Sequence, residues 1–125
     1  MAGQNASYII GRIKSEIPGM DVATALDFLD NNEDIYVQVV EVYIEEYIRE
    51  DIDRALEASD IDLYRTRVHA LKSSSRSIGA MELAKGAEEL EMAAKASDLD
   101  LINAKHAKVM SEYSDLIEKL KDITV

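Results

Sequence analysis

Apolar residues recur every three or four positions through most of the chain, which is the spacing of amphipathic helices. The clearest example is a narrow stripe formed by Ile61, Tyr64, Val68, Leu71, Ser75 and Ile78. A second stripe begins at about residue 80 and comprises Leu83, Ala87, Leu90 and Ala94. A third follows Ser97 and Asp98 and comprises Leu101, Ala104, Ala107 or Lys108, Tyr113, Leu116 and Leu120. The pattern predicts three long helices in the second half of the chain.

A fourth long helix is predicted to follow the turn-forming residues 30–32. Its expected inward positions are Ile35, Val39, Val42, Tyr43, Tyr47, Ile48 and Ile52. Its β-branched residues would also suit a strand, but no hairpin turn follows and the spacing is that of a helix. Two shorter helices are predicted before it: one over 6–17, ended by Pro18 and Gly19, and one capped by Asp21.

Local signals mark both ends of the predicted helix that carries the stripe from Ile61 to Ile78. Ser59 and Asp62 have the spacing of a capping box before it, and Gly79 is a typical helix stop after it. The low aromatic content of 6% and the single proline also favour packed helices over sheets. We therefore predict an all-α fold: an antiparallel four-helix bundle over 17–125, with a helical extension over 1–16, in a single domain.

The charge of the chain excludes several classes of partner. A formal net charge of −11 argues against binding to nucleic acid or to anionic membrane surfaces. The chain has no cysteine, and we find no signal peptide and no apolar stretch long enough to cross a bilayer. These features predict a soluble, monomeric, cytoplasmic protein, and the lack of a linker-like tail favours a free-standing one.

One histidine lies in an unusual electrostatic environment. His69 sits about 130° around its helix from the apolar stripe and should face water or a partner. Arg65, Lys72 and Arg76 lie on the same flank, in a stretch from 64 to 81 that contains no acidic residue, and Ser73 lies on the other side. An exposed imidazole among cations is poorly suited to binding a metal but well suited to accepting a phosphoryl group. Lys72, one turn on, is the best candidate to hold a phosphate oxygen, and these neighbours are the expected phosphate-stabilising and docking residues. His106, between Lys105 and Lys108, has no comparable surroundings, and we assign it no role.

The segment around His69 resembles the signature of histidine-containing phosphotransfer (HPt) domains from multistep phosphorelays. The matching positions are His69, Leu71, Lys72, Ser74, Ser75, Ile78, Gly79, Ala80 and Leu83. The resemblance extends over most of the chain from about residue 17. It implies a four-helix bundle in which His69 shuttles a phosphoryl group between aspartates of response-regulator receiver domains or a hybrid histidine kinase. It also implies no metal in the carrier itself, because Mg²⁺ belongs to the receiver.

The same resemblance suggests two finer features. The family often has a polar residue on the next helix that binds the second imidazole nitrogen, and Glu91 occupies that position, where an amide is common. The family also usually has glycine directly after the lysine, where this chain has Ser73. The exposed side of the His69 helix is the expected docking surface for a partner. Ile10, Ile13 or Met20 from the short helices are candidates for its apolar rim.

Two other classes of function are open to test. The main alternative is a binding module of the same fold that docks on a kinase or receiver without transferring phosphate. An enzyme is disfavoured because the chain has no glycine-rich phosphate loop and no Glu-x-x-His pair for a di-iron site. The serines at 73–75 have neither a positioned base nor a pocket, so they do not form a nucleophile site.

Overall fold

The computed structural model describes residues 5–124, and its regular elements are all helices. In chain order they are α1 (Ala6–Glu16), α2 (Val22–Asp27), α3 (Glu33–Glu45), α4 (Arg49–Glu57), α5 (Ile61–Ser77), α6 (Met81–Lys95) and α7 (Leu99–Thr124). No helix in this part of the chain is long and apolar enough to cross a membrane. The predicted all-α class is confirmed.

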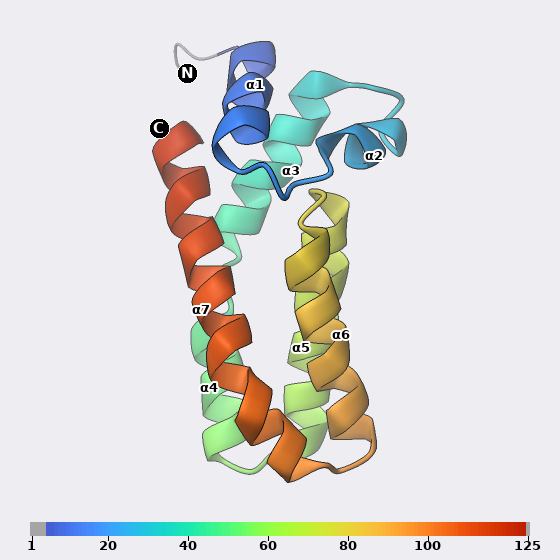
Figure 1. Cartoon of the computed structure of the whole chain (residues 1–125), viewed down its shortest axis with the longest axis vertical. Coiled ribbons are helices and arrows are strands. Elements are labelled where there is room, and N and C mark those ends of the chain that lie inside the picture. Colours follow the sequence, from blue (N-terminus) through green and yellow to red (C-terminus); the bar gives the residue numbers. More distant parts are fainter. Residues whose placement is uncertain (1–4, 125) are drawn as a thin grey trace.

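Four helical rods form the body of the molecule (Figure 1). The first rod consists of α3 followed by α4, and the others are α5, α6 and α7. The short helices α1 and α2 lie at one end of the bundle, where Arg12 of α1 is 3.6 Å from Asp122 near the end of α7. The predicted four-helix bundle with short N-terminal helices is therefore confirmed.

The prediction of one continuous helix between residues 33 and 52 is wrong, because the helix stops at Glu45 and restarts at Arg49. At the break, the backbone N–H of Ile48 donates to the hydroxyl of Tyr113 on α7, at 3.1 Å. The Tyr47 hydroxyl lies 2.6 Å from Ser114 Oγ on the same helix. Side chains of α7 thus bond to groups at the break, and this contribution from a distant helix has no signal in the local sequence.

The predicted inward face of α3 is also partly wrong. The buried residues are Tyr36, Val37, Val40 and Tyr43, whereas Ile35 and Val42 are exposed. Both faces of this helix carry apolar residues, so periodicity alone does not select one of them. Two hydrogen bonds favour the observed face: the Tyr36 hydroxyl donates to the Ile78 carbonyl, and the Tyr43 hydroxyl bonds to Ser75 Oγ.

Helix α5, which carries His69, ends where the sequence predicts. Gly79 has a φ of +88°, the left-handed region that glycine adopts without strain. Its N-terminal cap differs from the prediction, because Asp60, not Ser59, accepts the backbone N–H of Leu63. Ser59 instead has a φ of +55° in the turn after α4.

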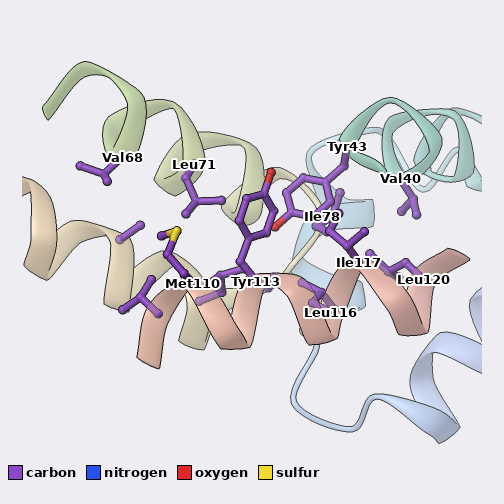
Figure 2. Close-up of a cluster of buried hydrophobic side chains, with 14 of the residues drawn as sticks. Val40, Tyr43, Val68, Leu71, Ile78, Met110, Tyr113, Leu116, Ile117 and Leu120 are labelled. Carbon is purple, nitrogen blue, oxygen red and sulfur yellow. The ribbon is translucent and has the colours of Figure 1, made fainter. Parts of the chain in front are cut away.

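Figure 2 shows part of the core, where buried side chains of α3, α5 and α7 meet, and the same core includes residues of α6. The predicted stripe of α5 is buried from Tyr64 to Ile78, and the stripe of α6 is buried as well. In α7 the prediction fails for the first turns, where Leu101 and Ala104 are exposed and the core residues are Ile102, Val109 and Met110. Ile10 and Ile13, suggested as docking residues, belong to the core and are not available to a partner.

Candidate functional site

His69 lies in the middle of α5, on the side turned away from the core. Tyr64, Val68 and Leu71 of the same helix are completely buried. They orient α5 so that the imidazole at position 69 projects outward, with 56% of its side chain exposed to solvent. The ring is therefore accessible to a second protein while its backbone is held by a rigid helix.

Glu91 of α6 connects the imidazole to a lysine. One of its carboxylate oxygens, Oε2, is 2.7 Å from His69 Nδ1, and the other, Oε1, accepts a hydrogen bond from Lys72 Nζ at 2.6 Å. The Glu91 side chain is only 6% exposed, and that of Lys72 is 16% exposed. A buried carboxylate needs such partners, because an unpaired buried charge is strongly unfavourable.

The protonation state of Glu91 determines which imidazole nitrogen is free. Burial acts to raise the pKa of Glu91, but the hydrogen bonds and positive charges of Lys72 and His69 outweigh it, so the pKa lies below its ordinary value. The carboxylate is therefore ionised at neutral pH and can only accept hydrogen bonds. Nδ1 of His69 must carry the proton that it donates to Glu91, and the lone pair of a neutral ring then lies on Nε2.

This pKa shift predicts a dependence of stability on pH. Because the folded-state pKa of Glu91 is lower than its ordinary value of 4.5, ionised Glu91 stabilises the fold above that pH. The contribution is lost as the pH falls through the folded-state pKa. We expect the stability advantage of wild type over Glu91→Gln to shrink as the pH falls below the ordinary value of 4.5 toward the lower folded-state pKa. Urea titrations of both proteins at each pH measure it, and a difference independent of pH would contradict the assignment.

The two arginines predicted near His69 differ in whether they pair with a carboxylate. Arg76 pairs with Glu88 of α6. Arg65 is exposed, one turn before His69, and enters no ion pair within residues 5–124. Ser73 is exposed one turn after His69. Only Lys72 shares a direct partner with the imidazole among the three cations expected from sequence.

Gly79 and Ala80 lie at the end of α5, away from the imidazole. Gly79 approaches the segment before α2 closely, and its carbonyl accepts the backbone N–H of Asp21 at 2.8 Å. Ala80 is buried at the start of α6. These two residues shape the turn that sets α5 and α6 side by side, and they do not contact His69 directly.

Lys95 is a site residue that the sequence analysis did not identify. Its ammonium group is 3.8 Å from Glu91 Oε2, the same oxygen that bonds to His69, and 59% of its side chain is exposed. Lys95 lies one helical turn after Glu91 on α6. The four-residue spacing of Glu91 and Lys95 is visible in the sequence. It becomes relevant to His69 only once α5 and α6 are known to pack together.

The surroundings of His106 differ from the prediction that it has no special neighbourhood. Its side chain is only 15% exposed, and its two ring nitrogens bond to other helices. Nε2 is 2.7 Å from Asp53 Oδ1 of α4, and Nδ1 is 2.9 Å from the Tyr64 hydroxyl of α5. Burial raises the pKa of Tyr64, so its hydroxyl stays protonated and can donate to the ring. His106 links three helices and leaves no accessible lone pair.

This network predicts a measurable contribution to stability. Tyr64→Phe removes the hydroxyl and leaves Nδ1 of His106 without that partner. We expect the unfolding free energy to fall by about 1–2 kcal/mol, the usual effect of removing one partner from a hydrogen bond that is largely shielded from water. Tyr8→Phe, on an exposed tyrosine, provides the matched control and should change it little. Equal effects of the two substitutions in urea denaturation would contradict a stabilising role for the network.

Within residues 5–124, no group of three or more histidine, cysteine, aspartate or glutamate side chains is arranged to hold a metal ion. No curated protein and no solved structure matches the chain significantly. The Hpt domain model matches residues 27–123, which include every helix of the bundle and the His69–Glu91 pair. The chain therefore belongs to the Hpt domain family, whose members act in phosphotransfer and are not autonomous kinases.

Proposed function

We propose that this protein is a phosphocarrier of a multistep two-component phosphorelay, with His69 as the phosphoryl acceptor and donor. The observation that carries the proposal is the exposed imidazole whose Nδ1 is bonded to the buried, ionised Glu91. This arrangement leaves the Nε2 lone pair of a neutral ring directed away from Glu91. A nucleophile of this kind can attack phosphorus without an additional base, since no proton has to leave Nε2.

The proposed reaction is an exchange between an aspartate and a histidine. The Nε2 lone pair of His69 forms a bond to phosphorus, and the bond between phosphorus and the aspartyl oxygen of a receiver domain breaks, which returns a free carboxylate to the receiver. The phosphorylated ring keeps its Nδ1 proton and gains positive charge. Glu91 stabilises that charge through the existing hydrogen bond. Donation to a second receiver is the same exchange in reverse.

The surrounding cations would favour an approaching phosphorylated partner. Arg65 and Arg76 are exposed on the flank of α5 nearest His69, and Lys72 holds the far oxygen of Glu91. The partner expected to dock here is a response-regulator receiver domain or a hybrid histidine kinase, which would supply the aspartate and its Mg²⁺. We propose that the carrier acts as a cytoplasmic monomer without a metal or other cofactor of its own.

Phosphoryl transfer from a phosphorylated receiver domain tests this proposal. The protein is mixed with several phosphorylated receivers in turn, and its intact mass is measured before and after brief acid treatment. Addition of one phosphoryl group that acid removes and mild base preserves would support a phosphohistidine. A lack of label with every receiver, together with measurable binding, would rule out the carrier function.

That second outcome would favour the alternative of a docking module that does not transfer phosphate. One observation supports this alternative: the position after Lys72 carries Ser73, where the family usually has glycine. The serine side chain is exposed beside His69 and adds volume to the surface on which a receiver would dock. Ser73→Gly separates the two functions, because it should increase the transfer rate of a carrier and should not create transfer in a pure binding module.

A further inference from the structure

Of the three cations on the His69 flank of α5, two are already engaged with carboxylates and only Arg65 enters no ion pair within residues 5–124. Lys72 bonds to Glu91 Oε1 at 2.6 Å, and Arg76 pairs with Glu88. Lys72 cannot leave Glu91 without depriving a buried carboxylate oxygen of its partner, which is unfavourable. A phosphoryl group on His69 therefore has Arg65 as its one uncommitted cation on α5, and any further compensation has to come from a cation of α6 that can move freely.

Lys95 meets this requirement. Its Nζ is 3.8 Å from Glu91 Oε2, beyond hydrogen-bond distance, while His69 Nδ1 bonds to the same oxygen at 2.7 Å. The ammonium group thus lies in the immediate surroundings of the imidazole. With 59% of the side chain exposed, it can reorient without breaking a buried interaction.

The pairing of α5 with α6 shows which part of the site Lys95 serves. Arg76 pairs with Glu88, and one turn earlier on α5 Lys72 pairs with Glu91, so the two helices run in opposite directions. Lys95 lies one turn beyond Glu91, on the side away from Glu88, so along the helix pair it is level with His69 and about one turn from Lys72. The Glu91 carboxylate that bonds the imidazole thus has Lys72 held at Oε1 and the exposed, mobile Lys95 close to Oε2.

We propose that Lys95 contacts the phosphoryl group carried by His69 and stabilises its negative charge, an inference that rests on the proposed phosphocarrier function. A phosphoryl group adds close to two negative charges at neutral pH, next to the carboxylate of Glu91. Lys72 balances Glu91, so the added charge requires a further cation. Lys95 supplies it by turning from Glu91 Oε2 toward the phosphoryl oxygens, where a charge-assisted hydrogen bond can form.

Chemical phosphorylation tests this role without a protein partner. Phosphoramidate transfers its phosphoryl group to Nε2 of His69 as the nitrogen–phosphorus bond of the reagent breaks and ammonia leaves. Wild type, Lys95→Gln, Lys95→Arg and the control Lys85→Gln are compared. Lys85 is exposed on the same helix, over the groove between α6 and α7, so its substitution removes the same charge away from His69.

We expect Lys95→Gln to lower the initial labelling rate about threefold relative to Lys85→Gln, the effect of one partly screened charge. Lys95→Arg should restore the rate, and salt should slow Lys95→Gln less than wild type. A ³¹P titration of the labelled proteins gives a second measurement. Loss of Lys95 should raise the pKa of the phosphoryl group, because the dianion loses a nearby cation.

Two outcomes would overturn the inference and are distinguishable from each other. If wild type is labelled on His69 but Lys95→Gln matches Lys85→Gln in rate and in ³¹P titration, Lys95 has no contact with the phosphoryl group and the carrier function stands. If wild type accepts no phosphoryl group from phosphoramidate or from any receiver, the proposed function and the role of Lys95 fail together.

Discussion

Replacement of His69 by glutamine is expected to abolish the acid-labile label that a phosphorylated receiver transfers to the wild-type protein. Glutamine has a similar polar character and can still bond to Glu91, but its amide nitrogen has no available lone pair to attack phosphorus. His69 is 56% exposed and outside the core, so the variant should fold like wild type. The expected effect is a complete loss of transfer with little change in unfolding free energy.

His106→Gln provides the matched control, because it removes the other histidine of the chain. Both nitrogens of His106 are engaged with Asp53 and Tyr64, and its side chain is only 15% exposed. This variant should keep the label, at a temperature where it remains folded by circular dichroism. A label on His69→Gln, or its loss from folded His106→Gln, would show that His69 is not the acceptor.

Substitution of Gly79 by alanine is expected to destabilise the protein strongly, although it adds only one methyl group. Gly79 has a φ of +88°, and a Cβ atom built there would lie 2.4 Å from the carbonyl oxygen of Asp21. That neighbour is backbone, so it cannot turn aside as a side chain would. The Asp21 N–H also donates to the Gly79 carbonyl, which ties the two segments together. We expect the unfolding free energy to fall by about 2–4 kcal/mol from strain and overpacking combined.

Gly19→Ala is the appropriate control for this substitution. Gly19 lies in the loop between α1 and α2, and a Cβ atom there would meet nothing within 4 Å. We expect it to change the unfolding free energy by less than about 0.5 kcal/mol. Urea denaturation followed by circular dichroism measures both variants. Similar midpoints for the two would contradict the close approach of Gly79 to Asp21.

The half of the chain that contains His69 could be predicted largely from local sequence. The stripe of α5 has a single apolar face, Gly79 provides an unambiguous stop, and α6 has an equally regular stripe. Where one face is apolar and the other polar, burial of the apolar face is strongly favoured and the orientation follows. For this reason the exposure of His69 could be predicted from the sequence alone.

The same reasoning failed where local patterns were ambiguous. Helix α3 has apolar residues on both faces, and its buried side depends on bonds from Tyr36 and Tyr43 to α5 and its C-terminal end. The break after α3 involves the Tyr113 hydroxyl on α7, 65 residues away in the sequence. Near the start of α7, periodicity assigned Leu101 inward, whereas Ile102 is buried. Each outcome depends on residues distant in the chain.

The sequence by itself thus determined the helical class, the α5 stripe and the outward position of His69, because these depend on periodicity and on one glycine. Only the tertiary structure decided what surrounds the imidazole. It paired Lys72 with Glu91, brought Lys95 close to the carboxylate oxygen bonded to His69, and engaged His106 in a partly buried network. These contacts join side chains from different helices, and their distances depend on how the helices pack, which the spacing of residues along one helix does not specify.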